Sequence, residues 1–479
     1  MSGITSSIST AGNALNVLQQ ALSVIQNNID NASTPGYATQ QLNLEAMPLD
    51  IAGGMTGGVM AGGLDDSRDQ YAEEAVQSQT QALGFYTAQV QNTGTIQSFF
   101  DVTGTSGVSA SLSALFQSFS AWSTTPDDPT AQQNVLAAAN TVAQSFQGLS
   151  NSLTQTAQQM DTQVGSTVQQ INTIATQIQQ YNVQRLQSPT PDPGAEAQLY
   201  SALDNLSQLT NFSTVTQSNG TVTVLLAGGT PLVDGTQQDV LSSNVSVDTQ
   251  PPPVYAQSLP TDHVLDSQGN DVTSEITGGQ LGGLLDTRNR VVGGILGDSQ
   301  QQGTLNQLAQ GLADTVNNIL ESGTVSTAAG AANGTALFTY NSANPATAAS
   351  TLALNTAITP DQLAPVDASG NANGNANALA ALENPTGTQG TIGGSSYIQY
   401  FGQIAGGAGQ ENSTATANEQ AQQQVAAQAT TLRGQVSGVS LDTEASAVLQ
   451  FQQAYQATAQ VLTVLDNLGS DLMNLIVPT

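Results

Sequence analysis

The 479-residue chain carries 35 aspartates and glutamates against five arginines and no lysine, so its formal net charge is −30 at pH 7. A field of this sign repels phosphate groups, which argues against nucleic acid and against an anionic membrane as partners. Cysteine is absent and histidine occurs once, so the composition excludes disulfides and a zinc site built from Cys and His.

Apolar residues recur along the first thirty positions in alternating steps of four and three. A mean step of about 3.5 residues keeps such side chains on one side of an α-helix and predicts a coiled-coil seam. The positions are Ile4, Ile8, Ala11, Leu15, Leu18, Leu22, Ile25 and Ile29. The rest of this helix is Ser, Thr, Asn and Gln, so we expect the apolar stripe to be buried against another long helix.

The segment that follows, residues 27–37, predicts a helix stop. Pro35 cannot continue a helix, and Gly36 supplies a turn that other residues resist. An apolar N-terminal helix that ends in N-I-x-N-x-x-T-P-G-Y resembles the start of the bacterial flagellar rod, hook and hook-associated proteins. The residues that carry this motif are Asn28, Asn31, Thr34, Pro35, Gly36 and Tyr37. That family usually has an arginine soon after Gly-Tyr, whereas Ala, Thr and Gln stand here, so any ion pair of that arginine is absent.

Residues 48–64 alternate glycine pairs with apolar residues, which predicts a flexible or short β connection. A phosphate-binding loop would end in G-K-[ST], and the chain has no lysine. Helical patterns then run over residues 67–100 and 108–122. A long uninterrupted pattern follows at residues 130–187, which as one helix would extend roughly 85 Å. The W-S-T-T-P-D-D-P turn before it and the helix itself resemble the helical core of the hook-associated protein 1 (FlgK) family.

The middle of the chain predicts two insertions in this helical rod. Period-2 patterning over residues 212–265 predicts a small β domain, with a stiff break at three consecutive prolines. A helical pattern returns at residues 279–320, where G-G-L-L-D-T-R-N-R again resembles the FlgK family. Residues 323–395, rich in Gly, Ala, Asn and Thr, predict a second excursion of loops and short strands. An Ala/Gln helix over residues 412–436 leads to the C-terminus.

The C-terminal helix carries the same stepping as the first. Its apolar positions are Leu441, Val448, Phe451, Tyr455, Leu462, Leu465, Leu472 and Ile476. The run F-Q-Q-A-Y-Q-A followed by a Leu-rich helix is similar to the other end of the flagellar axial proteins. We therefore predict that the two chain ends pair as a coiled-coil stalk. We call the two sets of apolar positions together the terminal seam.

These patterns predict a mainly α, multidomain fold with inserted β domains. The expected division is a terminal coiled-coil domain, a helical rod domain, an inserted β-rich domain and a second loop/β excursion. The terminal coiled-coil domain comprises residues 1–47 and 437–479, and the helical rod domain comprises 48–190, 279–322 and 396–436. The inserted β-rich domain comprises 191–278, and the second loop/β excursion comprises 323–395.

Residues that could carry chemistry are few. His263 is the only base available to a Ser-His-Asp or Cys-His arrangement, and it lies between a proline-rich loop and a turn. The run D-S-Q-G-N-D-V-T-S-E at residues 266–275 departs from the EF-hand calcium pattern and favours a hairpin turn. We predict no catalytic, cofactor-binding or metal site, and no enzyme.

The family resemblance implies a structural subunit at the hook–filament junction of the bacterial flagellum. It implies four partners: further copies in a ring or tube, the hook protein, the second hook-associated protein, and an export chaperone on the C-terminal helix. We find no signal-peptide pattern and no run of about 18 apolar residues. We therefore expect no membrane span and export to the outside of the cell without a cleaved signal peptide.

Two alternatives remain open at this point. One is another flagellar axial protein, such as a hook, rod or second junction subunit. The other is a secreted adhesin or degradative enzyme on the same stalk, which would need convergent acids in a pocket within residues 195–278 or 323–395.

Overall fold

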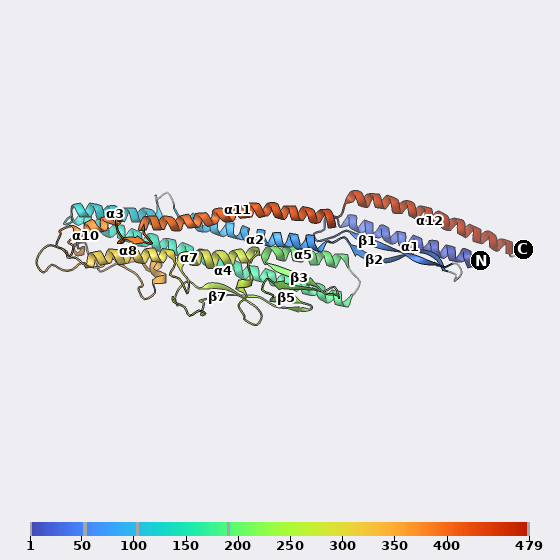
Figure 1. The fold of residues 1–479 in the computed structure, drawn as a ribbon, viewed down its shortest axis with the longest axis horizontal. Helices are drawn as coiled ribbons and strands as arrows, with labels where there is room; N and C mark the ends of the chain where they lie inside the picture. Colours follow the sequence, from blue (N-terminus) through green and yellow to red (C-terminus); the bar gives the residue numbers. More distant parts are fainter. Residues whose placement is uncertain (1, 51–54, 102–104, 189–191, 477–479) are drawn as a thin grey trace.

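The chain forms a long, narrow molecule in which a terminal stalk continues into a helical rod (Figure 1). The computed structural model describes residues 2–50, 55–101, 105–188 and 192–476. It is mainly α-helical with small antiparallel sheets, which confirms the predicted fold class.

The stalk is built from both chain ends, as predicted. Helix α1 (Ser2–Asp30) and helix α12 (Leu441–Ile476) lie side by side and run in opposite directions, so that the two termini share one tip (Figure 1). Strands β1 (Gln40–Asp50) and β2 (Met55–Asp66) form an antiparallel hairpin that packs on α1. The domain boundary predicted at residues 47/48 therefore falls inside β1, because the glycine-rich connection is part of a long hairpin that belongs to the stalk.

The rod is dominated by helices that run along its length. They are α2 (Gln70–Ser98), α3 (Gly107–Thr124), α4 (Pro129–Gln187) and α11 (Tyr397–Ser437). Helix α4 is one continuous helix of 59 residues, as predicted. It begins where the Asp128 carboxylate accepts a hydrogen bond from the Thr130 N–H and Pro129 takes the first helical position, where its missing N–H has no cost.

Helix α5 (Pro193–Leu209) was not predicted and lies within the segment assigned to a β domain. Its buried face consists of Ala197, Leu199, Ala202, Leu203, Leu206, Ser207 and Leu209. This face packs on α2 and α4, so the helix belongs to the rod. The β-rich part begins only at Phe212.

The β-rich part consists of a sheet and a separate hairpin on the side of α4 (Figure 1). The sheet has the order β3-β4-β5-β6, and the hairpin pairs β7 with β8. The strands are β3 (Phe212–Thr216), β4 (Val222–Leu226), β5 (Pro231–Asp234), β6 (Gln237–Gln238), β7 (Ser242–Ser246) and β8 (Thr261–Leu265). Their buried side chains, including Val224, Val233 and Val264, share one apolar cluster with α4, α5 and α6.

The helix predicted over residues 279–320 is divided. A 3-10 turn η1 (Thr273–Glu275) leads to α6 (Gly279–Leu285), the π-helical turn η2 (Asp286–Val292), α7 (Gly293–Leu296) and then α8 (Thr304–Glu321). The break lies at Gly297 and Gly303, which adopt φ angles of +90° and +83°. A Cβ on Gly303 would lie 2.2 Å from the Gly297 backbone nitrogen, so the two chain segments meet more closely than any side chain allows.

The segment predicted as a second excursion contains short strands and loops but also short helices. Its elements are β9 (Phe338–Thr339), η3 (Pro345–Thr347), α9 (Ala348–Thr351), β10 (Ala353–Leu354), η4 (Pro360–Gln362), α10 (Gly374–Ala381), β11 (Thr391–Ile392) and β12 (Ser395–Ser396). Leu337, Leu352 and Leu379 are fully buried in the apolar cluster formed with α3, α4 and α8. The predicted boundary at residue 323 is therefore not a break in the core.

Candidate functional site

The two helices that carry the terminal seam contact each other at both ends of the stalk. Near the tip, a Cβ on Gly469 would lie 3.7 Å from Cγ2 of Ile4, and Ile4, Ile8 and Leu472 line one small cavity. At the other end of the stalk, Asn28 Nδ2 donates a hydrogen bond of 3.1 Å to Glu444 Oε1. The predicted stripes thus lie along antiparallel helices.

Most seam positions are at least partly covered in the single chain, and Ala11 and Ile25 are buried. Two members are exposed: Leu441 at 56% and Tyr455 at 37%. The side chain of Ile476 lies outside the described part of the structure. Val17 and Ala21 are buried on α1 although the seam pattern omitted them, because α1 also packs against β1 and β2.

A second apolar stripe on α12 was missed by the sequence analysis. Its residues are exposed and comprise Val461, Val464 and Leu468. Met473 is exposed as well, but it lines the cavity that Ile4 and Ile8 share with Leu472. The steps of three and four from Val461 to Leu468 are visible in the sequence, one residue out of phase with the seam positions Leu462 and Leu465. The β1–β2 hairpin adds the exposed residues Leu44, Met47, Leu49 and Met60. We call Val461, Val464 and Leu468 of α12 the outer stripe.

The motif residues lie where the stalk joins the rod, a region that we call the terminal junction. Asn28 is 1% exposed and uses its whole side chain. Its Nδ2 donates to the Gln40 carbonyl and to Glu444, and its Oδ1 accepts from the Tyr37 hydroxyl and the Gln40 N–H. This one amide therefore links α1, the start of β1 and α12 by hydrogen bonds. Burial raises the pKa of its partner Glu444.

Gly36 brings the motif against the rod. Its φ is +75°, and a Cβ there would lie 2.3 Å from the Ala197 carbonyl oxygen of α5. Its own carbonyl accepts a hydrogen bond of 2.8 Å from Arg68 Nη2. Within the turn, Thr34 Oγ1 donates to Asn31 Oδ1 at 3.0 Å, and Pro35 is exposed. The P-G pair thus sets both the turn and its contact with α5.

A chain of charges continues from this turn into the rod. Glu73 of α2 accepts hydrogen bonds from Arg68 Nη1 at 2.7 Å and from Arg433 Nη1 of α11 at 3.0 Å. Arg433 also binds Asp204 of α5 at 2.8 Å, and the Arg68 guanidinium lies 3.6 Å from the centre of the Tyr200 ring. Burial raises the pKa of Tyr200 to about 12, although Arg68 opposes this shift. Three rod helices are thereby linked to the motif.

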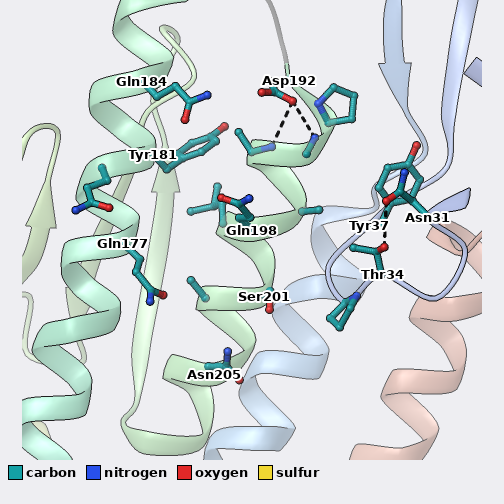
Figure 2. A pocket seen from close by; sticks show the side chains of 18 of the residues that line it. Asn31, Thr34, Tyr37, Gln177, Tyr181, Gln184, Asp192, Gln198, Ser201 and Asn205 are labelled. Carbon is teal, nitrogen blue, oxygen red and sulfur yellow. Dashed lines mark hydrogen bonds between the residues drawn. The ribbon is translucent and has the colours of Figure 1, made fainter. Parts of the chain in front are cut away.

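A cleft of about 840 Å³ opens beside the junction, between the motif, α4 and α5 (Figure 2). Its labelled lining side chains are mostly amides and hydroxyls, among them Gln177, Gln184 and Asn205. Among the described residues that line it, Asp192 is the one carboxylate, and it accepts the Gly194 N–H as the N-cap of α5. Paired carboxylates or a nucleophile beside a base are not among them, so this lining does not resemble a hydrolase site.

Comparison with known proteins assigns the family. The model of the flagellar hook-associated protein FlgK helical domain matches residues 93–338, just over half of the chain. The chain belongs to the FlgK family. A second model, that of the flagella basal body rod protein, matches residues 8–37 and so ends at Tyr37 of the motif.

Two relatives of this FlgK-family chain share one name. Flagellar hook-associated protein 1 of Bacillus subtilis is 26% identical over 98% of this chain and 97% of its own length. The protein of that name from Salmonella typhimurium is 26% identical over 66% of this chain and 56% of its own length. The solved structure of the flagellar hook junction protein FlgK from Burkholderia pseudomallei aligns with a TM-score of 0.47 and 26% identity, over 57% of this chain and 47% of that one.

Membership of the FlgK family makes this chain a structural protein of the bacterial flagellum at the hook–filament junction. The predicted resemblance is thereby confirmed. Across the described residues, no helix combines the length and apolar character needed to cross a membrane. No group of three or more His, Asp or Glu side chains that could hold a metal ion occurs in that same part of the chain.

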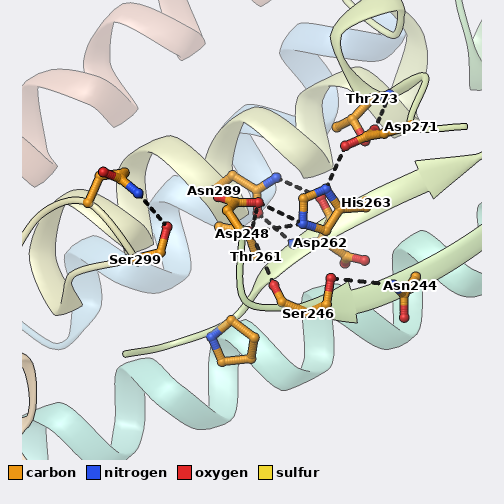
Figure 3. Close-up of polar contacts among 12 residues, drawn as sticks. Asn244, Ser246, Asp248, Thr261, Asp262, His263, Asp271, Thr273, Asn289 and Ser299 are labelled. Carbon is orange, nitrogen blue, oxygen red and sulfur yellow. Dashed lines mark hydrogen bonds and ion pairs between the residues drawn. The ribbon is translucent and has the colours of Figure 1, made fainter. Parts of the chain in front are cut away.

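His263 of this FlgK-family chain lies on β8 rather than in a loop (Figure 3). Its Nε2 is 3.0 Å from Asp248 and its Nδ1 is 2.9 Å from Asp271, so both ring nitrogens face carboxylates. Asp266 closes a tight turn by accepting from the N–H groups of Gln268 and Asn270, which confirms the predicted hairpin turn. Nε2 of His263 also lies 3.0 Å from the Thr261 hydroxyl, so the histidine is held by two carboxylates and a threonine.

Proposed function

We propose that this chain acts as a non-enzymatic adaptor that joins hook to filament through its terminal stalk. The observation that carries the proposal is that α12 has two apolar faces. One face packs on α1, and the outer stripe is exposed in the single chain. Exposed apolar side chains that lie together on one face of a helix are typical of surfaces that become covered in an assembly.

In this proposal the outer stripe contacts α1 or the β1–β2 hairpin of neighbouring copies. Such a contact joins two different surfaces, so repetition makes a ring or tube rather than a closed dimer. One rim of the ring then binds the hook protein and the other binds the second hook-associated protein. Before assembly, an export chaperone covers α12, because an uncovered apolar helix promotes aggregation.

The charge of the chain supports an assembly that relies on apolar and amide contacts. Three arginines are held in internal ion pairs, Arg68 with Glu73, Arg288 with Asp161 and Arg290 with Asp286. Arg433 is likewise bound by Glu73 and Asp204. Few cations are thus available to attract an acidic neighbour. Contacts between copies must therefore gain their free energy mainly from burial.

The test compares Leu468→Asp with Asn467→Asp in cells that depend on this protein. Both positions are exposed on α12 and both variants add one carboxylate, but only Leu468 belongs to the outer stripe. We expect Leu468→Asp to leave hooks without filaments in electron micrographs and to abolish swimming. Asn467→Asp should keep both functions. Equal filament numbers in the two strains, at equal amounts of exported protein, would refute the assembly role of the stripe.

A further inference from the structure

Asp262 is a buried carboxylate without a hydrogen-bond partner. It lies on β8, is 0% exposed, and neither of its carboxylate oxygens is bonded to any described residue. Its backbone is fixed, because its N–H donates to Asn289 Oδ1 and its carbonyl accepts from Asn289 Nδ2, both at 2.9 Å (Figure 3). The side chain is therefore held in the interior between the β7–β8 hairpin and η2.

Two ionisable groups from other elements face this carboxylate. Asp161 of α4 lies within hydrogen-bonding reach of Asp262, and Arg288 of η2 is the nearby cation. Arg288 is itself engaged, since its Nε donates to Asp161 at 2.6 Å and its Nη2 donates to the Pro260 carbonyl at 2.7 Å. With both carboxyls ionised, the cluster would hold two negative charges against one positive charge. A buried net charge of this kind is costly, and one bound proton removes it.

We propose that Asp161 and Asp262 share one proton, and that this proton fastens the β7–β8 hairpin to the rod. Two ionised carboxylates can only accept hydrogen bonds, so no hydrogen bond can form between them, and their like charges repel each other. A proton on Asp262 turns its hydroxyl into a donor toward Asp161, while Asp161 keeps its bond to Arg288. The bond then joins β8 to α4 across the interface between the outer β-rich part and the longest helix.

Burial, together with the nearby charge of Asp161, raises the pKa of Asp262 to about 7, while Arg288 opposes the shift. Because the closed state binds the proton more tightly than an open one, the proton stabilises docking at low pH. That stabilisation is lost as pH rises from the ordinary carboxyl range through about 7. Asp161 keeps 16% of its side chain exposed, which gives the proton a path to solvent.

A second group of charged residues, around His263, lies on the other side of β8. Side chains alternate along a strand, so His263 points away from Asp262 and lies between Asp248 and Asp271. The β7–β8 hairpin could respond to pH through either group. Any test must therefore separate the Asp161–Asp262 pair from the histidine.

The experiment is hydrogen exchange by mass spectrometry on the full chain between pH 5 and 8.5, corrected for the intrinsic pH dependence of exchange. In the wild type, we expect the opening constant of β7 and β8 to rise about tenfold per pH unit between pH 5 and 7, and to level off above pH 8. Asp262→Asn should remove the slope. Asp271→Asn, which changes the contacts of His263 and Thr273 but leaves the Asp161–Asp262 pair intact, should keep it.

A flat wild-type profile would overturn the proposal without the use of any variant. An Asp262→Asn chain with the wild-type slope would also overturn it, and loss of the slope in Asp271→Asn would assign the response to His263 instead. If Asp262→Asn fails to fold, Asp161→Asn provides the second variant. Its amide can donate to ionised Asp262, so the slope should again be lost. The proposal does not depend on the assembly role of the outer stripe.

Discussion

Substitution of Gly36 by alanine tests whether the motif positions the stalk on the rod. Gly36 adopts a φ of +75°, and its Cα faces the backbone of α5. An added Cβ would lie 2.3 Å from the Ala197 carbonyl oxygen and 2.8 Å from the Ser201 nitrogen, whereas real Cβ contacts are essentially never under 3.0 Å. Both contacts are with backbone atoms that cannot rotate away. The turn and α5 must therefore separate by at least about 0.7 Å.

The cost has two parts. A left-handed backbone conformation costs a non-glycine residue about 1–2 kcal/mol. The shift also weakens the charged hydrogen bond from Arg68 to the Gly36 carbonyl, and such a bond contributes about 1.5–3 kcal/mol. We expect Gly36→Ala to lower the free energy of opening of the terminal junction by about 3 kcal/mol.

The assay is hydrogen exchange of α1, α12 and α4 in the full chain, together with swimming of the complemented strain. Gly36→Ala should speed exchange at the base of α1 and at the start of α12 about a hundredfold, while the centre of α4 stays unchanged. The matched control is Gly12→Ala on α1, where an added Cβ has nothing within 4 Å. In that helical position alanine should slow exchange slightly. If Gly36→Ala behaves like Gly12→Ala, the contact with α5 is not what orients the stalk.

Two further predictions concern charge. Glu73→Gln should destabilise the start of α2 and the end of α11 by about 3 kcal/mol, because it leaves Arg68 and Arg433 without their buried shared carboxylate. Hydrogen exchange of these two helix ends measures the loss. Glu74→Gln, at the exposed neighbouring position, should have little effect. Lowering the pH from 7 to 3 should move the net charge from −30 toward a small positive value and promote self-association in light scattering, with less change in about 1 M salt. Scattering that stays flat over this range would contradict the view that carboxylate repulsion keeps the chains apart.

The local rules of the sequence were sufficient for the longest helix. Thr130 to Gln187 holds no proline and repeats its apolar residues at helical spacing, so one long helix was predictable and α4 confirms it. The break at Gly297 and Gly303 was not predictable, because nothing local reveals that the two segments pack so closely that a Cβ on Gly303 would lie 2.2 Å from the Gly297 nitrogen. Helix α5 was not predicted although its leucines have helical spacing, because three prolines within residues 189–193 are typical of a break between helices.

Some features of the candidate site were predictable from local sequence, and others required the tertiary structure. The motif and the two apolar stripes were readable from the chain, since helical periodicity and the P-G turn are properties of neighbours in sequence. The partners of the motif were not: Glu444 lies 416 residues from Asn28, and Arg433 lies 360 residues from Glu73. Which face of α12 covers α1, and which face remains exposed as the outer stripe, likewise depends on how the antiparallel helices rotate against each other.

By itself, the sequence determined that this is an acidic, mainly helical chain whose two ends carry matching apolar stripes and a flagellar motif. Spacing along one chain encodes such features directly. Only the tertiary structure decided that Asn28 binds Gln40 and Glu444 together, that Gly36 packs on α5, and that Asp262 faces Asp161 across the β-rich interface. Those contacts join residues far apart in sequence, and burial of the whole fold, rather than any local preference, selects them.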